Sequence, residues 1–174
     1  MSYYLCMLGA STVIMIYNKK VLLMLRDDYD WIPDPNKWEF PGGMQELGET
    51  LLETGIREIR EEVNINLISP YFLVEDGKSG ETIHNLYIEY LNDSQAQSAK
   101  KGSEGKDMGF FAYNDLYKLE LKPQIEYLLK KHPGLVKDIM EGDPISIVKI
   151  KNRLKNALVK DGIISNNPLD KGSS

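Results

Sequence analysis

Three carboxylates, Glu58, Glu61 and Glu62, lie close together in the stretch between Trp38 and Ile65. In a helix, residues three and four positions apart lie on the same side, so the oxygens of these side chains would be neighbours. Neighbouring anions repel one another, and the helix macrodipole disfavours negative charge at the C-terminal end, where these acids fall. A bound divalent cation would compensate both effects. Because the donors are all oxygens, the pattern predicts a hard ion, Mg²⁺ or Mn²⁺, rather than zinc.

The segment that carries these acids has the signals of a well-specified helix. Thr50 and Glu53 fit a capping box, with threonine at the N-cap and glutamate three residues later. An apolar stripe that could pack on a sheet follows at helical spacing: Leu52, Ile56, Ile59 and Val63. Gly55 costs about 1 kcal/mol relative to alanine inside a helix, and it therefore predicts the close approach of another backbone.

Residues 43–65 resemble the Nudix box, in which G, five residues, E and seven residues precede R-E-U-x-E-E-x-G-U, with U aliphatic. Gly43, Glu49 and the run Arg57-Glu58-Ile59-Arg60-Glu61-Glu62-Val63-Asn64-Ile65 match every fixed position except the last glycine, which is Asn64 here. That glycine would end the helix in a left-handed conformation, which asparagine tolerates next best. The resemblance implies an α/β fold, a Nudix-like α/β/α sandwich with a mixed central sheet and, here, an extra C-terminal helix.

The composition bounds the class of protein. The 174 residues, 42% of them hydrophobic and 27% charged, suffice for one globular domain with an appended element. Cys6 is the single cysteine, so no internal disulfide can form, and we expect a reducing, cytoplasmic location with Cys6 as a small buried side chain. The net charge of −5 argues against a partner such as duplex nucleic acid. The apolar start is too short to span a bilayer, so no membrane association is expected.

Two apolar runs before the acidic helix, Ser11–Tyr17 and Val21–Arg26, predict a β-hairpin around residues 18–20. The unbroken apolar run from Val21 to Leu25 indicates a strand covered on both faces. After the helix, residues 66–69 and 71–75 read as strand pieces, and a turn at 76–80 leads to a strand over 82–91.

A polar loop with two prolines, residues 26–37, connects the hairpin to the Nudix box. Its aromatic and charged residues could contact a base or a sugar, or the loop could simply lie on the surface with Trp31 as its anchor. Arg26 could bind a substrate phosphate or form an ion pair with one of the nearby aspartates.

Residues 92–106 are polar and predict a mobile loop. In many Nudix enzymes a glutamate about six residues before an aromatic residue at this place supplies a further metal ligand or the general base. Glu104 matches by position, and Asp107 is the nearby competitor and a candidate substrate-binding residue. The alternative for Glu104 is an ordinary loop acid.

The Nudix domain is expected to comprise residues 1–133 and to end with a helix from Pro123, which suits the first helical position. A helical extension follows at 134–164, with Asp143 and Pro144 as its N-cap and first residue. One face carries Ile147, Lys151, Leu154 and Leu158, and Asp161-Gly162 ends the helix. This helix could dock on the domain, on a second copy in a homodimer or on another partner. Residues 165–174 are expected to form a disordered tail.

The resemblance also implies roles for the acids. Glu58 and Glu62 are the first choice as metal ligands, and Glu61 is a third ligand or the general base, a role for which Glu104 competes. A carbonyl at Gly42 or Gly43 could complete the metal site, because glycine lets the backbone approach closely. Arg57 would orient Glu49 or a ligand carboxylate; the alternative is a surface pair with Glu53 or Glu61.

The Nudix family hydrolyses nucleoside diphosphates linked to another moiety, so the resemblance implies a small-molecule nucleotide substrate and a Mg²⁺-dependent pyrophosphohydrolase. The run Trp38–Gly43 resembles the mutator-type branch that trims nucleoside triphosphates, including oxidised dGTP. Residues 79–82 lack the tyrosine of some dinucleoside polyphosphate hydrolases and the proline of ADP-ribose hydrolases, which disfavours both. Hydrolysis of a nucleotide sugar or a dinucleoside polyphosphate remains an alternative, as does a non-catalytic nucleotide-binding module. The intact acids argue against the module.

Overall fold

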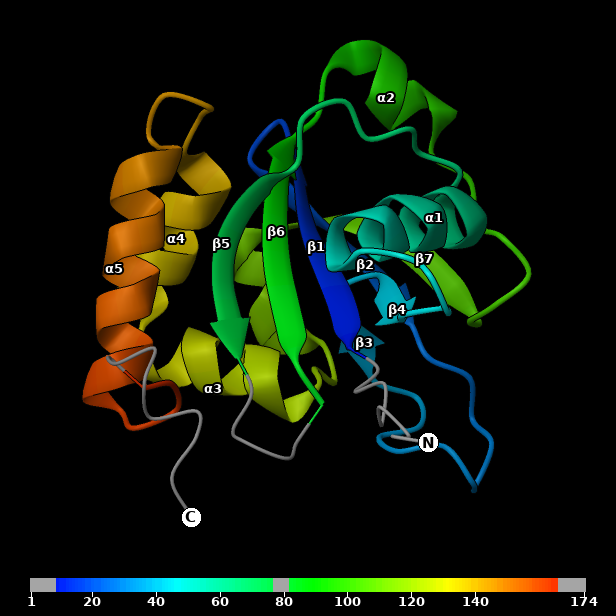
Figure 1. The fold of residues 1–174 in the computed structure, drawn as a ribbon, viewed down its shortest axis with the longest axis horizontal. Coiled ribbons are helices and arrows are strands. Elements are labelled where there is room, and N and C mark those ends of the chain that lie inside the picture. The colour runs from blue at the N-terminus through cyan, green and yellow to red at the C-terminus, as the bar shows by residue number, and fades with distance from the viewer. Residues whose placement is uncertain (1–8, 77–81, 166–174) are drawn as a thin grey trace, which may run out of the picture.

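The computed structural model describes residues 9–76 and 82–165, which form a mixed β-sheet between two layers of helices (Figure 1). The strands are β1 (Ala10–Tyr17), β2 (Lys20–Leu25), β3 (Trp38–Glu39), β4 (Gly42–Met44), β5 (Tyr71–Asp76), β6 (His84–Tyr90) and β7 (Asp107–Ala112). The helices are α1 (Leu51–Val63), α2 (Asp93–Ser98), the 3₁₀ helix η1 (Tyr113–Lys118), α3 (Pro123–Lys131), α4 (Pro133–Glu141) and α5 (Ile147–Lys160). The α/β/α sandwich with a mixed sheet is therefore confirmed.

Strand β1 is the centre of the sheet, whose order is β3-β2-β1-β6-β5, with β4 paired to β1 and β7 to β2. It runs parallel to β6 and antiparallel to β2 and β4. The predicted β1–β2 hairpin is confirmed. Asn18 and Lys19 at its turn both have positive φ, 48° and 60°, as a tight two-residue hairpin turn requires.

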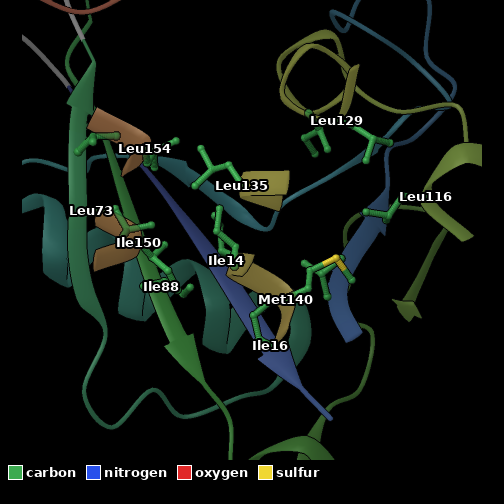
Figure 2. Close-up of a cluster of buried hydrophobic side chains, with 14 of the residues drawn as sticks. Ile14, Ile16, Leu73, Ile88, Leu116, Leu129, Leu135, Met140, Ile150 and Leu154 are labelled. Carbon is green, nitrogen blue, oxygen red and sulfur yellow. The ribbon is translucent and has the colours of Figure 1, made fainter. Parts of the chain in front are cut away.

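The two faces of β1 feed two separate apolar clusters, because side chains alternate along a strand. Ile14 and Ile16 point into a large cluster shared with α3, α4 and α5, which Figure 2 shows. Val13 and Met15 point into a smaller cluster on the side of α1. Strand β2 is likewise buried on both faces, as its unbroken apolar run predicted. The helix that carries the acids thus rests on a rigid, fully covered sheet.

Helix α1 begins with the predicted capping box: the Thr50 side chain accepts from the Glu53 N–H, and the Glu53 side chain accepts from the Thr50 N–H. It ends at Asn64, whose φ of 56° is the left-handed conformation expected there. The predicted apolar stripe is half wrong. Ile59 and Val63 are buried, whereas Leu52 and Ile56 are 40% and 38% exposed.

Small residues take the place of Leu52 and Ile56 on the buried side of α1. Thr54 and Gly55 face the sheet, where Gly55 lies against the side chains of Ser11 and Val13. A Cβ at Gly55 would meet those side chains at ordinary contact distances of 3.4 Å and above, so the backbone approach expected there is wrong. The small surface nevertheless lets the first half of α1 lie close to β1.

The C-terminal helices pack on the same domain. Ile147, Leu154 and Leu158 of α5 are buried in the large cluster, together with residues of α3 and α4 (Figure 2). Lys151, expected on the same face, instead lies over the rings of Tyr71 and Phe72. Of the three docking partners considered for this helix, the structure shows the first, because α5 packs on its own domain against the sheet and α4.

Three boundaries differ from the sequence-based expectation. Helix α5 begins at Ile147 rather than Pro144, because Asp143 and Ser146 form a turn in which each backbone N–H donates to the other's side chain. Residues 66–69 form no strand. The segment expected to be a mobile loop, residues 92–106, contains α2, which begins with a capping box formed by Asn92 and Gln95.

Cys6, the turn at 77–80 and the tail after residue 165 lie outside the described residues. No helix among the described ranges combines the length and apolar composition needed to cross a membrane.

The orientation of α1 can be tested with two isoleucines on the same helix. Ile59 is fully buried, so Ile59→Ala should lower the free energy of unfolding by about 2–5 kcal/mol, the cost of a large-to-small change in a core. Ile56→Ala makes the same chemical change at an exposed position and should cost less than about 1 kcal/mol. Urea unfolding of both variants measures the difference. Equal losses would mean that α1 is rotated relative to the sheet.

Candidate functional site

The acidic end of α1 lies over β4, whose two glycines permit a close approach. The Gly42 N–H donates to Glu62 Oε2 at 2.9 Å. A Cβ on Gly42 would overlap the Ser11 carbonyl oxygen, and one on Gly43 would overlap the Glu58 carboxylate. Gly42 is therefore required by its backbone surroundings, whereas a larger residue at position 43 would displace the Glu58 carboxylate. The backbone of these glycines therefore lies against Glu58 and Glu62, and the metal-donor role expected for one of their carbonyls stays a prediction.

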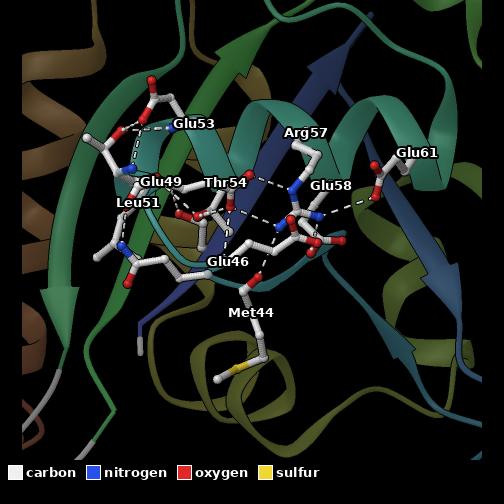
Figure 3. Close-up of polar contacts among 12 residues, drawn as sticks. Met44, Glu46, Glu49, Leu51, Glu53, Thr54, Arg57, Glu58 and Glu61 are labelled. Carbon is white, nitrogen blue, oxygen red and sulfur yellow. Dashed lines mark hydrogen bonds and ion pairs between the residues drawn. The ribbon is translucent and has the colours of Figure 1, made fainter. Parts of the chain in front are cut away.

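Arg57 organises the glutamates on the outer side of this end of α1 (Figure 3). Its guanidinium holds Glu49 through Nε and Nη2, at 2.7 and 3.1 Å, and its Nη1 donates to Glu58 at 2.9 Å and to Glu61 at 3.3 Å. Nη2 also donates to the Met44 carbonyl oxygen at 3.1 Å. The contact with Glu49 that the orienting role of Arg57 requires and the alternative pair with Glu61 are both present, and the role itself stays a prediction. Glu53 instead takes part in the capping box.

The pKa values of three of these glutamates differ with their burial and with their contact with Arg57. Hydrogen bonds from Arg57 lower the pKa of Glu49 to about 2. Burial raises the pKa of Glu58, an effect that Arg57 opposes and that the charges of Glu61 and Glu104 increase. Burial raises the pKa of Glu62 to about 8, against the hydrogen bond from Gly42. None of the ion pairs within the described residues includes Glu62, so this carboxylate has no paired cation there.

The segment that leads to Glu104 lies at the C-terminal end of α1. This loop is tied to the helix end, where the Lys100 N–H donates to the Val63 carbonyl at 2.9 Å and the Gly102 N–H donates to the Glu62 carbonyl at 2.7 Å. The charge of Glu104 contributes to the raised pKa of both Glu58 and Glu62. The loop therefore brings an acid that is distant in sequence to the carboxylates of α1.

Asp107, the competitor of Glu104, is placed differently. It begins β7, pairs with Leu25 of β2, and its carboxylate accepts a hydrogen bond from the adjacent Met108 N–H at 2.8 Å. The carboxylate of Asp107 is therefore engaged by the backbone of its own strand.

Arg26 has a partner that the sequence analysis missed. Its Nη1 contacts Glu39 Oε1 at 2.5 Å, and Lys122 contacts the other oxygen of Glu39 at 2.8 Å. The expected pairing of Arg26 with a nearby aspartate is wrong. Glu39 also contributes to the raised pKa of Glu62, so it is a further acid at the edge of the site. The sequence feature that could have indicated Glu39 is its position in the run that leads from Trp38 to the two glycines.

The donor chemistry fits a hard divalent ion, although the side chains do not form a finished ligand shell. Within the described ranges, no group of three or more Asp, Glu, His or Cys side chains stands ready to hold a metal. Arg57 engages Glu58 and Glu61, and Glu62 turns to the Gly42 N–H. The donors are nevertheless all oxygens, and the raised pKa values of Glu58 and Glu62 show negative charge that a cation would relieve.

Comparison with known proteins agrees with this geometry. The family model described as NUDIX domain matches residues 7–131. The m7GpppN-mRNA hydrolase NUDT17 of Xenopus laevis is 48% identical over 59 residues, which cover 34% of this chain and 20% of that protein. The ADP-ribose pyrophosphatase of Methanocaldococcus jannaschii is 29% identical over 128 residues, which cover 71% of this chain and 67% of that protein.

The fold has solved counterparts as well. The MutT NUDIX hydrolase from Burkholderia pseudomallei matches with a TM-score of 0.58 at 21% identity, over 71% of this chain and 96% of that chain. At this identity the likeness concerns the fold. The chain spans only a fifth of the Xenopus protein, so that match concerns a short stretch and not the whole relative.

The raised pKa of Glu62 predicts a pH dependence of stability in the metal-free protein. Between its ordinary pKa of 4.5 and about 8, folded Glu62 keeps a proton that the unfolded chain has released, so the free energy of unfolding falls as pH rises through this window. Glu62→Gln removes the titrating group, and its amide oxygen can still accept from Gly42. In a chelator, the Tm of this variant minus that of the wild type should therefore increase from about pH 5 to about pH 8.5.

Glu141→Gln, which removes an exposed carboxylate on α4, is the control for this experiment. Its Tm relative to the wild type should change little over the same range. If the Tm difference between Glu62→Gln and the wild type is equally independent of pH, the pKa of Glu62 is not raised in the folded protein.

Proposed function

The chain belongs to the NUDIX domain family of hydrolases, and on that premise we propose that it is a divalent-metal-dependent pyrophosphohydrolase of nucleotides. It would cleave a nucleoside di- or triphosphate-type substrate to a nucleoside monophosphate by attack of water on phosphorus. The observation that carries this proposal is the meeting of Glu58 and Glu62 of α1 with the glycine backbone of β4, beside the segment that leads to Glu104. A binding module has no evident use for acids held in mutual repulsion.

Phosphoanhydride hydrolysis requires positive charge at the phosphates and removal of a proton from the attacking water. Mg²⁺, or Mn²⁺ in its place, would supply that charge when held by Glu58 and Glu62, with a carbonyl of Gly42 or Gly43 as a further donor. Arg57 fixes the directions of Glu58 and Glu61 through its Nη1 and is itself held by Glu49. The raised pKa of Arg57, caused chiefly by Glu49, keeps this clamp charged at any working pH.

We assign the proton acceptor to Glu104 rather than Glu61. An oxygen of Glu61 already accepts a hydrogen bond from Arg57 at 3.3 Å, which restricts the direction of this carboxylate. Among the ion pairs of the described residues, none includes Glu104, which is exposed on its loop and acts on both α1 ligands. It can therefore approach a water molecule beside the substrate phosphate.

Two substrate classes are supported by separate observations. The run Trp38–Gly43 resembles the branch that trims nucleoside triphosphates, including oxidised ones. The ADP-ribose pyrophosphatase relative, in contrast, matches along 128 residues, well beyond the acidic helix, and supports a nucleoside diphosphate linked to a sugar. Most of the window used against ADP-ribose, residues 79–82, lies outside the described residues. The composition, with one cysteine, supports a cytoplasmic enzyme.

A substrate panel tests the proposal. Purified protein with Mg²⁺ is offered nucleoside triphosphates, an oxidised dGTP, ADP-ribose, a dinucleoside polyphosphate and a capped dinucleotide. At least one should yield a nucleoside monophosphate, and the product mass after reaction in ¹⁸O-labelled water identifies the phosphorus attacked. No metal-dependent product from any member would favour a nucleotide-binding module instead.

Removing the charge of Glu62 should lower turnover strongly without unfolding the protein. Glu62→Gln should lower kcat by about a hundredfold or more, because the amide can accept from Gly42 but carries no charge for the metal. Glu126→Gln is the matched control, since Glu126 lies exposed on α3 and pairs with Lys130. Steady-state kinetics with the best substrate of the panel give both values. Comparable activity of the two variants would remove Glu62 from the site.

The choice between the two acids of the 104–107 segment can be tested in the same assay. Glu104→Gln should lower kcat by about tenfold or more, as expected for loss of a general base, and should flatten the acidic limb of the pH profile. Asp107→Asn keeps the oxygen that accepts from Met108 and should have a much smaller effect. A larger loss for Asp107→Asn would reverse the assignment.

A further inference from the structure

Two aromatic rings stand exposed on the loop that connects β2 and β3. Tyr29 and Trp31 stack on one another, with ring centroids 4.6 Å apart and planes inclined by 8°. Trp31 is 78% exposed and Tyr29 is 49% exposed, so the expectation that Trp31 anchors the loop is wrong. The pair instead presents a flat aromatic surface to the solvent.

The loop that carries these rings is closed at its base. The Asn36 N–H donates to the Asp27 carbonyl at 3.1 Å, and the Arg26 N–H donates to the Lys37 carbonyl at 3.0 Å. Near the tip, the Ile32 N–H donates to the Tyr29 carbonyl at 3.2 Å, which turns the chain between the two rings. The rings are thus held on a structured turn.

The same loop is fastened to the segment that carries Glu104. The Gly105 N–H donates to Asp27 Oδ2 at 3.2 Å, and the Lys106 ammonium contacts Asp28 and Asn36, each at 2.9 Å. Trp31 is four positions after Asp27 in the chain, so their Cα atoms lie within about 14 Å of one another. The aromatic surface therefore belongs to the surroundings of the acidic site.

The charge of the loop indicates which part of a nucleotide it could contact. Its acids are Asp27, Asp28, Asp30 and Asp34. Of the loop's cations, Arg26 is already paired with Glu39. Phosphate groups would be repelled from this segment, whereas an uncharged flat ring would not. Stacking on aromatic side chains is the contact that every nucleobase can make.

We infer that Tyr29 and Trp31 form the stacking platform for the base of the nucleotide substrate. The inference rests on the proposed function, because it requires that the pyrophosphate of the same molecule lies at Glu58 and Glu62. The platform contributes to binding and makes no contact with the reacting phosphorus, so it selects substrates that carry an aromatic base through KM.

Trp31 can report this contact directly, because the chain contains two tryptophans and Trp38→Phe leaves Trp31 as the single one. The fluorescence of this variant is titrated with AMP and GMP, and separately with ribose 5-phosphate, which lacks a base. Saturable quenching by the nucleotides alone is the expected result. No quenching by the nucleotides, or equal quenching by ribose 5-phosphate, overturns the inference.

Kinetics supply a second measurement that leaves Trp38 in the core. Trp31→Ala should raise KM for the best nucleotide substrate by about tenfold, the effect of losing one base-stacking contact. Its kcat should stay within about twofold, and Trp31→Phe should recover most of the KM. Ile145→Ala, at a 90% exposed apolar residue before α5, is the control. An unchanged KM for Trp31→Ala overturns the inference but not the proposed hydrolase function. If the wild type shows no turnover, the proposed function is wrong, and the fluorescence titration still tests base stacking.

Discussion

The repulsion among carboxylates at the end of α1 is the constraint on which the rest of the site depends. Arg57 offsets part of it by holding Glu49, Glu58 and Glu61 with one guanidinium. Because Nε and Nη2 are both taken by Glu49, a single nitrogen is left to serve the other two acids. Glu62 lies beyond this clamp and accepts a hydrogen bond from a backbone N–H, and burial raises its pKa to about 8. The clamp thus sets directions for the acids and leaves the charge that a cation would neutralise.

A site with uncompensated charge requires a scaffold whose stability comes from elsewhere. Here it comes from β1 and β2, which are covered on both faces and separate two apolar clusters. Helix α1 is fixed to this sheet at its C-terminal half by Ile59 and Val63, directly beneath the acids. Backbone N–H groups of the loop that follows α2 donate hydrogen bonds to the last carbonyls of α1. The segment that leads to Glu104 is therefore positioned by the same helix end that carries Glu58 and Glu62.

The sequence predicted the features that depend on neighbours within about four residues, such as the capping box at Thr50 and the left-handed end at Asn64. It did not predict features set by packing between distant segments. Leu52 and Ile56 fit an apolar stripe by spacing, but the sheet accepts the smaller Thr54 and Gly55 instead. The pairing of Arg26 with Glu39 depends on how β3 lies beside β2, which no local pattern encodes. The capping box of α2, in contrast, was a local signal hidden by polar composition.

The division between chemistry and recognition follows from this architecture. In the proposed enzyme, the acids of α1 and the glycines of β4 would act on any pyrophosphate, because they would contact the part that all such substrates share. Discrimination must therefore come from groups outside this core, and the loops at 26–37 and 100–106 are the segments fastened to it. Asp27 and Gly105 join these two loops by a hydrogen bond. A substrate whose distal part contacts the first loop would therefore bind to a surface that is already fixed beside the segment of Glu104, so this contact would act on affinity and leave proton transfer to the acids.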